Sequence, residues 1–229
     1  MKKLQLITGF LLTAMVFTSC FDLIEEVHYK KDGSGTYKFT MDMSGLKGLM
    51  ELAMSADTTG EFKMDTLSAV SKELSAKVRD LDGITNIREI TDSENLVFGV
   101  EFDFRDVKAL NLAMKEGFSD DELNSTTEKS FFQASKKSFQ RIDARGFGGM
   151  LDQMLSSGLG GEDEMDMAQM FLKDVSYTMI YHFDRKVKKV SNNLATVSDD
   201  KKTVTLKYFL FDDTRGGKTG SIENTIKLK

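Results

Sequence analysis

A single thiol is the most reactive side chain in this sequence of 229 residues. Cys20 is the only cysteine, and it stands at the end of an apolar leader that follows Lys2 and Lys3. A basic head, an apolar centre and small residues at the end are typical of a secretory signal. The apolar part, residues 4–17, is shorter and more interrupted than the roughly 20 mostly apolar residues that span a bilayer. We therefore expect residues 1–19 to be a signal peptide that is removed from the mature protein.

The residues around this thiol, Phe17-Thr18-Ser19-Cys20, resemble the lipobox of bacterial lipoproteins, although leucine is usual where Phe17 stands. The resemblance implies that Cys20 takes up a diacylglycerol thioether and that a type II signal peptidase cuts between Ser19 and Cys20. It also implies acylation of the new amino group, with palmitate as an expected chain. In the sorting rule of that family an aspartate after the cysteine favours the inner membrane. Phe21 stands there, so the resemblance implies the outer membrane and leaves the periplasmic and surface faces both open.

The alternative to a lipid anchor is an ordinary signal peptide followed by a free cysteine. An unpaired thiol in a secreted chain invites oxidation or mispairing, so the lipid-anchored form is the one we expect. Each buried methylene of an acyl chain contributes about 0.8 kcal/mol, and two or more chains hold a protein stably on a membrane. We expect residues 20–26 to be a short lipid-anchored tether and residues 27–229 to form a single α+β domain.

The two histidines of the chain are the other side chains suited to chemistry. His28 and His182 lie far apart in sequence, on different predicted strands, so a metal site or catalytic dyad requires the fold to bring them together. We expect instead two histidines on the surface or on a sheet face. Residues 78–89 imitate a calcium-binding EF-hand loop in part, but Val78 occupies the first position, which needs a carboxylate. The sequence therefore predicts no metal ligand, no cofactor, no catalytic residue and no enzyme.

Charge and composition limit the classes of partner. The formal net charge is −5, and no basic stripe is present, which excludes a nucleic-acid partner. The chain is 40% hydrophobic and 29% charged, as is typical of globular proteins. Only one cysteine is present, so no disulfide forms within the chain and packing alone must stabilise the domain.

Alternating and helical patterns predict the elements that position these residues. Strands are expected at 27–29 and 37–43 around a turn at 30–35, at 84–90 and 96–103, at 130–142, and at 175–190, 204–210 and 222–228. Helices are expected at 44–53, 65–81, 106–114, 150–155 and 162–171. Runs of hairpin-connected strands with inserted helices predict an α+β fold, in which an antiparallel sheet carries several helices packed on one face.

This layout resembles LppM-type bacterial lipoprotein domains. Three segments carry the likeness, namely Lys31–Thr36, Tyr177–Phe183 continuing into Val187–Asn192, and Asp199–Val204. Asp184 and Arg185 stand where that family usually has proline and glycine. The resemblance implies a membrane-tethered envelope domain and supplies no catalytic residue.

These observations predict a membrane-anchored lipoprotein of the cell envelope that acts as a structural or binding module. Its partner would be the membrane, through the acyl chains on Cys20, together with an envelope protein, a lipid or a glycan. One alternative is a carrier of an apolar ligand, with residues 150–155 and 165–171 as a lid over a cavity lined by Phe and Met. Another is a hydrolase with two facing carboxylates in a cleft, at least one of them in apolar surroundings.

Overall fold

Strands are the most abundant secondary structure in the part of the chain that the structure describes. The computed structural model describes residues 21–48, 65–118, 130–142, 174–210 and 221–229. The strands are β1 (Phe21–Tyr29), β2 (Gly35–Asp42), β3 (Ile84–Asp92), β4 (Val97–Phe104), β5 (Phe132–Ser135), β6 (Ser138–Arg141), β7 (Val175–Phe183), β8 (Val187–Val190), β9 (Thr196–Val197), β10 (Thr203–Phe209) and β11 (Asn224–Leu228). The helices in these ranges are η1 (Ser44–Leu46), α3 (Asp65–Val78) and α4 (Val107–Phe118). Both strands and helices form, as the sequence predicts, and the strands dominate.

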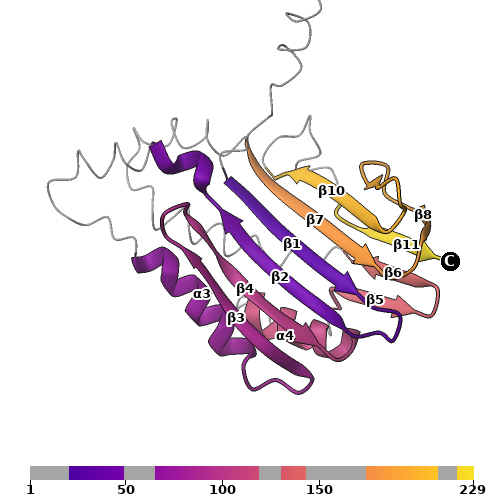
Figure 1. Ribbon diagram of the computed structural model, residues 1–229, viewed down its shortest axis with the longest axis horizontal. Helices are drawn as coiled ribbons and strands as arrows, with labels where there is room; N and C mark the ends of the chain where they lie inside the picture. Colours follow the sequence, from indigo (N-terminus) through magenta and orange to yellow (C-terminus); the bar gives the residue numbers. More distant parts are fainter. Residues whose placement is uncertain (1–20, 49–64, 119–129, 143–173, 211–220) are drawn as a thin grey trace, which may run out of the picture.

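The larger sheet has seven strands in the order β3-β4-β2-β1-β7-β10-β9 (Figure 1). The predicted hairpins β1–β2 and β3–β4 are confirmed, and Gly33 in the first turn has a φ of +95°, which glycine adopts readily. The prediction of a purely antiparallel sheet is wrong at the centre, where β1 pairs with β7 in parallel. Paired residues of β1 and β7 lie 154 positions apart, and nothing in the local pattern of either strand encodes that pairing.

The predicted tether is part of the sheet. β1 begins at Phe21, so the segment 21–26 is not a free linker but the first two thirds of a strand that pairs on both sides. Leu23 and Glu25 are fully buried, which a solvated tether would not allow. Glu25 occupies an inward position of this strand, where the alternating pattern would have an apolar residue. The pattern therefore does not predict a strand over residues 21–26.

A smaller, four-stranded sheet has the order β5-β6-β11-β8. Residues 130–142, predicted as one strand of mixed period, form the two strands β5 and β6 joined by a tight turn. The turn explains the mixed period, because a hairpin restarts the alternation in the middle of the segment. Aromatic contacts join this sheet to the larger one. The ring centroids of Phe139 lie 4.9 Å from Tyr29 and 5.5 Å from Tyr181.

Helices α3 and α4 gather at one end of the larger sheet, beside β3 and β4 (Figure 1). Asp106 caps α4 as predicted, with its Oδ1 accepting a hydrogen bond from the backbone N of Ala109 at 2.9 Å. The helix predicted at 44–53 is described only at its start, where η1 begins at Ser44 and has no side-chain cap. Among the described helices, α3 and α4 contact β3 and β4 while η1 contacts β1, so the described part of the chain does not show the predicted set of several helices packed together on one face.

The two faces of β1 differ in chemistry. Residues with odd numbers, from Phe21 to Tyr29, point into the core between the two sheets and are buried. Residues with even numbers point to the other side and are half-buried or exposed. The same alternation continues in most of β7 and in β10. On these three strands the outer face carries mostly polar side chains, together with Ile24, Ile180 and Phe209. Both histidines of the chain lie on that outer face.

Candidate functional site

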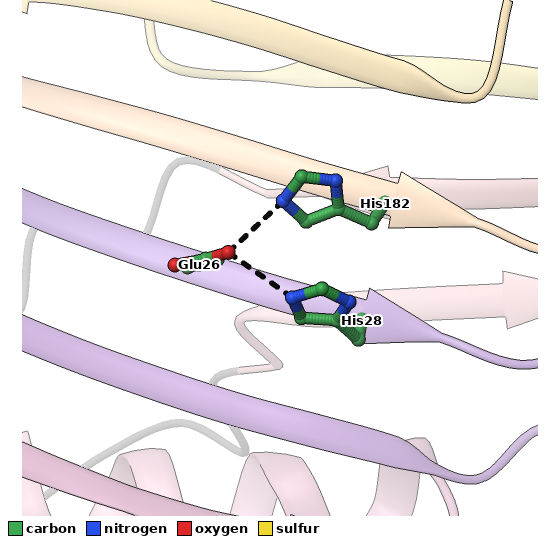
Figure 2. A group of neighbouring side chains, drawn as sticks. All are labelled: Glu26, His28 and His182. Atoms are coloured by element: carbon green, nitrogen blue, oxygen red, sulfur yellow. Dashed lines mark hydrogen bonds and ion pairs between the residues drawn. The ribbon is translucent and has the colours of Figure 1, made fainter.

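The parallel pairing of β1 with β7 places the two histidines side by side. His28 and His182 are direct partners in the register of the two strands. Their rings are stacked, with centroids 4.2 Å apart and an interplanar angle of 20°. Both lie on the sheet face, as the sequence predicts, but their direct contact was not foreseen, since it depends on a pairing between distant segments. Figure 2 shows the two rings extending from neighbouring strands on the same side.

Glu26 completes the group from β1, two residues before His28 and therefore on the same face. Its Oε1 atom lies 3.0 Å from the Nε2 of His28 and 3.0 Å from the Nε2 of His182 (Figure 2). Within the described residues, this carboxylate oxygen and the two ring nitrogens all lie within 4.8 Å of one another. Two imidazoles and a carboxylate at this spacing are a set of side chains that can hold a metal ion.

Neighbouring groups fix the charge and orientation of this cluster. Partial burial by itself raises the pKa of Glu26, but the hydrogen bond with His28 and the nearby charge of Lys38 outweigh it, so the pKa lies below its usual value. Glu26 is therefore a carboxylate at neutral pH. The Nδ1 of His182 lies 3.1 Å from the Oγ1 of Thr203 on β10, so the second nitrogen of this ring has a partner that holds its orientation.

The histidines open onto a shallow hollow with a volume of about 330 Å³. Its wall includes Lys30, Asp184 and Lys202 from the turns that follow β1 and β7 and precede β10. The hollow is open to solvent, so a small ligand or a water molecule can reach the two histidine side chains. The sequence contained one signal for this site, because Glu26 and His28 have the period-two spacing of one strand face. The strand predicted from the sequence begins only at Val27, so the prediction does not place Glu26 on the same strand face as His28.

A second charged group lies inside the protein, between the two sheets. Glu25 from β1 and Arg141 from β6 are both fully buried, with Arg141 Nε 3.1 Å from Glu25 Oε1. Tyr177 donates its hydroxyl to Glu25 Oε2 at 2.6 Å, and Tyr181 donates to Glu25 Oε1 at 2.7 Å. The guanidinium also donates to the backbone O of Ile142 at 2.9 Å. This network joins the two sheets by satisfied polar contacts.

Burial and the charge of Glu25 set the pKa values of the other groups in this network. Burial is the main cause that raises the pKa of Tyr177 and Tyr181 well above the ordinary value, and the charge of Glu25 adds to it. Burial alone would lower the pKa of Arg141, but the charge of Glu25 outweighs it and the pKa is raised. Glu25 is the carboxylate in apolar surroundings that a hydrolase would require, but here its oxygens face an arginine and two tyrosines. Among the described residues, no second carboxylate contacts Glu25, so the described part of the chain does not supply the facing pair of acids that the hydrolase alternative requires.

The other predicted features lie in different places. The partial EF-hand does not form a site, because Asp82 pairs with Arg105 while Glu89 accepts a hydrogen bond from Ser75. Ser19, Cys20 and the segments 150–155 and 165–171 lie outside the described residues, so signal cleavage, lipid attachment and a lid remain predictions. In the part of the chain that the structure describes, no helix has the length and apolar character that crossing a membrane requires.

Comparisons with known proteins provide one similarity. No family model matches the chain, and no curated protein matches it. Among solved structures, the chain is similar to the folded domain of LppM from Mycobacterium tuberculosis, determined by NMR. The similarity covers 91% of this chain and 88% of that domain, with 8% sequence identity and a TM-score of 0.35. It concerns the group of domains that the sequence layout resembles, at a level too low to carry an inference about fold or function.

Proposed function

We propose that this protein is a lipid-anchored domain of the bacterial cell envelope and acts as a binding module. The anchor is the acyl modification of Cys20, and the outer membrane is the expected location. The binding surface is the outer face of β1, β7 and β10, where Glu26, His28 and His182 converge. That convergence is the observation that favours a binding role, since three ligand-type side chains from two strands meet on one face of the sheet. The two histidines of the group also line a solvent-accessible hollow.

The position of β1 gives this proposal a defined geometry. β1 begins one residue after Cys20, so no linker separates the proposed anchor from the sheet. The seven residue-to-residue steps from Phe21 to His28 extend roughly 23 Å along a strand. Because β7 runs parallel to β1, the strands β1 and β7 start at the anchored end and carry the two histidines near the opposite end. The proposed site therefore lies at the end of these two strands opposite to the proposed anchor.

The anchor is tested by replacing its acceptor atom. A Cys20→Ser variant should lose incorporated radiolabelled palmitate and move from the membrane fraction to the soluble fraction, because at least two acyl chains are needed for stable anchoring. A Ser19→Ala variant keeps a small residue before the cysteine and serves as the matched control, which should retain both the label and the membrane fraction. Mass spectrometry of the processed amino terminus should show an acylated Cys20. An unmodified terminus, or an acylated Cys20→Ser variant, would refute the anchor.

A further inference from the structure

The outer-face cluster of Glu26, His28 and His182 has the donor set and spacing of a transition-metal site. A tetrahedral zinc ion bound at about 2.0–2.2 Å by two imidazoles and a carboxylate holds its ligand atoms about 3.3 Å apart. Here each Nε2 lies 3.0 Å from the same Oε1 atom, and all three atoms lie within 4.8 Å of one another. Small side-chain rotations therefore suffice to admit an ion among them.

The backbone already fixes most of this geometry. His28 and His182 are register partners in paired strands, and Glu26 is on the same face of β1. The backbone hydrogen bonds between adjacent strands hold the ligand residues in place. The free-energy cost of ordering them when an ion binds is therefore small. The rings are also close to parallel, with both Nε2 atoms directed at one point, as Figure 2 shows.

The surroundings support the ligand role of each group. Thr203 Oγ1 lies 3.1 Å from His182 Nδ1, and when that nitrogen donates a hydrogen bond to Thr203, Nε2 is the nitrogen that can coordinate an ion beside Glu26. Lys38 approaches the other oxygen of Glu26, Oε2, at 4.0 Å, which leaves Oε1 for an ion. The side chains are 53% exposed for His28, 31% for His182 and 23% for Glu26, so an ion can enter from solvent and keep an open coordination position.

We infer that Glu26, His28 and His182 bind a divalent transition-metal ion of the zinc class, with the fourth position open to water or to a ligand in the adjacent hollow. Imidazole ligands favour zinc, copper, cobalt and nickel, whereas calcium and magnesium require more oxygen ligands than this cluster offers. This inference rests on the proposed binding role, because it names the ligand of that module. It does not depend on the acyl anchor.

The test uses the full chain, purified from cells in detergent without a polyhistidine tag. Because the chain contains only two histidines, histidine-selective isotope labelling reports on this site alone. Titration with zinc chloride should saturate at one ion per chain and shift the side-chain resonances of both His28 and His182. Calorimetry should give the same stoichiometry, and cobalt chloride should produce the visible absorption of a tetrahedral ion. If zinc leaves both histidine resonances unmoved, the inference is wrong.

Variants distinguish zinc binding at this cluster from non-specific binding of zinc to an acidic protein. His28→Gln and His182→Gln should each weaken zinc binding by more than tenfold, and Thr203→Val by about tenfold through loss of the orienting contact. Glu101→Gln removes a carboxylate from the same sheet face, outside the cluster, and should leave the affinity unchanged. Circular dichroism checks that each variant is folded. Equal affinities in all four variants would overturn the inference.

The outcome is independent of the anchor test. A chain that is acylated at Cys20 but does not bind zinc contradicts the metal site and leaves the anchor standing. A chain that binds zinc but carries no lipid contradicts the anchor and leaves the metal site standing. If a His variant does not fold, the labelled wild-type protein and Thr203→Val still decide the question.

Discussion

The buried pair of Glu25 and Arg141 provides the most stringent test of how the two sheets are held together. An Arg141→Met variant keeps much of the side-chain volume but removes the only cation that contacts Glu25 among the described residues. Removing one partner from a buried ion pair leaves an uncompensated charge and typically costs about 3–5 kcal/mol. Tyr177 and Tyr181 still donate to the carboxylate, at 2.6 and 2.7 Å, so we expect a loss of about 3 kcal/mol in the free energy of unfolding.

The measurement is urea denaturation at neutral pH, followed by circular dichroism because the chain contains no tryptophan. Arg88→Met is the matched control, since Arg88 forms an exposed ion pair with Glu101 and surface pairs contribute about 0–1 kcal/mol. A loss below about 1 kcal/mol for Arg141→Met, equal to that of the control, would refute the reasoning.

A second variant tests the cause of the loss. Replacing the whole network, as Glu25→Leu, Arg141→Met, Tyr177→Phe and Tyr181→Phe together, removes both charges and the hydroxyl groups that depend on them. Buried ion pairs replaced by apolar side chains of similar volume are often neutral or stabilising. The quadruple variant should therefore be more stable than Arg141→Met alone. If it is less stable, the loss arises from packing and not from an unpaired charge.

Three further predictions concern stability. Ser71→Ala should cost about 1–3 kcal/mol in urea denaturation, because Ser71 Oγ accepts from the backbone N of Gly99 and donates to the backbone O of Ile90, both at 2.9 Å; a loss near zero would contradict this bridge. Gly99→Ala should lower the melting temperature strongly, since a Cβ there would lie 1.9 Å from the backbone O of Phe39, whereas Gly48→Ala, with nothing within 4 Å, should be tolerated. The raised pKa values of Tyr37, Tyr177 and Tyr181 give stability that is fully present below about pH 10 and is lost as the pH rises through the folded-state values, at about 1.4 kcal/mol per pH unit for each tyrosine. Tyrosinate absorbance should show these three of the five tyrosines ionising only as the protein unfolds, and normal titration of all five in the folded protein would contradict it.

Local patterns in the sequence were sufficient for the hairpins β1–β2 and β3–β4 and for α3 and α4, but not for the hairpin β5–β6. The Asp32-Gly33 turn, the alternation of β2 and β4 and the cap at Asp106 are each encoded within a few residues, where local sterics and hydrogen bonding decide the backbone. The same local reasoning failed in β1, because the inward Glu25 breaks the apolar alternation and its partner Arg141 lies 116 positions away.

The candidate site also depends on contacts between distant segments, which local sequence patterns do not predict. The sequence identified both histidines, Cys20 as a candidate anchor and the absence of any other thiol. Whether His28 lies beside His182 depends on the parallel pairing of β1 with β7, and such a pairing leaves no periodic signal in either segment.

The sequence by itself therefore determined the residue types available for chemistry and most of the strands that carry them. Only the tertiary structure decided which strands are neighbours, that the segment after Cys20 is a central strand, and that one carboxylate faces two imidazoles. The physical reason is that backbone conformation is governed by nearby residues. Strand order and charge pairing are governed by burial, which is a property of the whole chain.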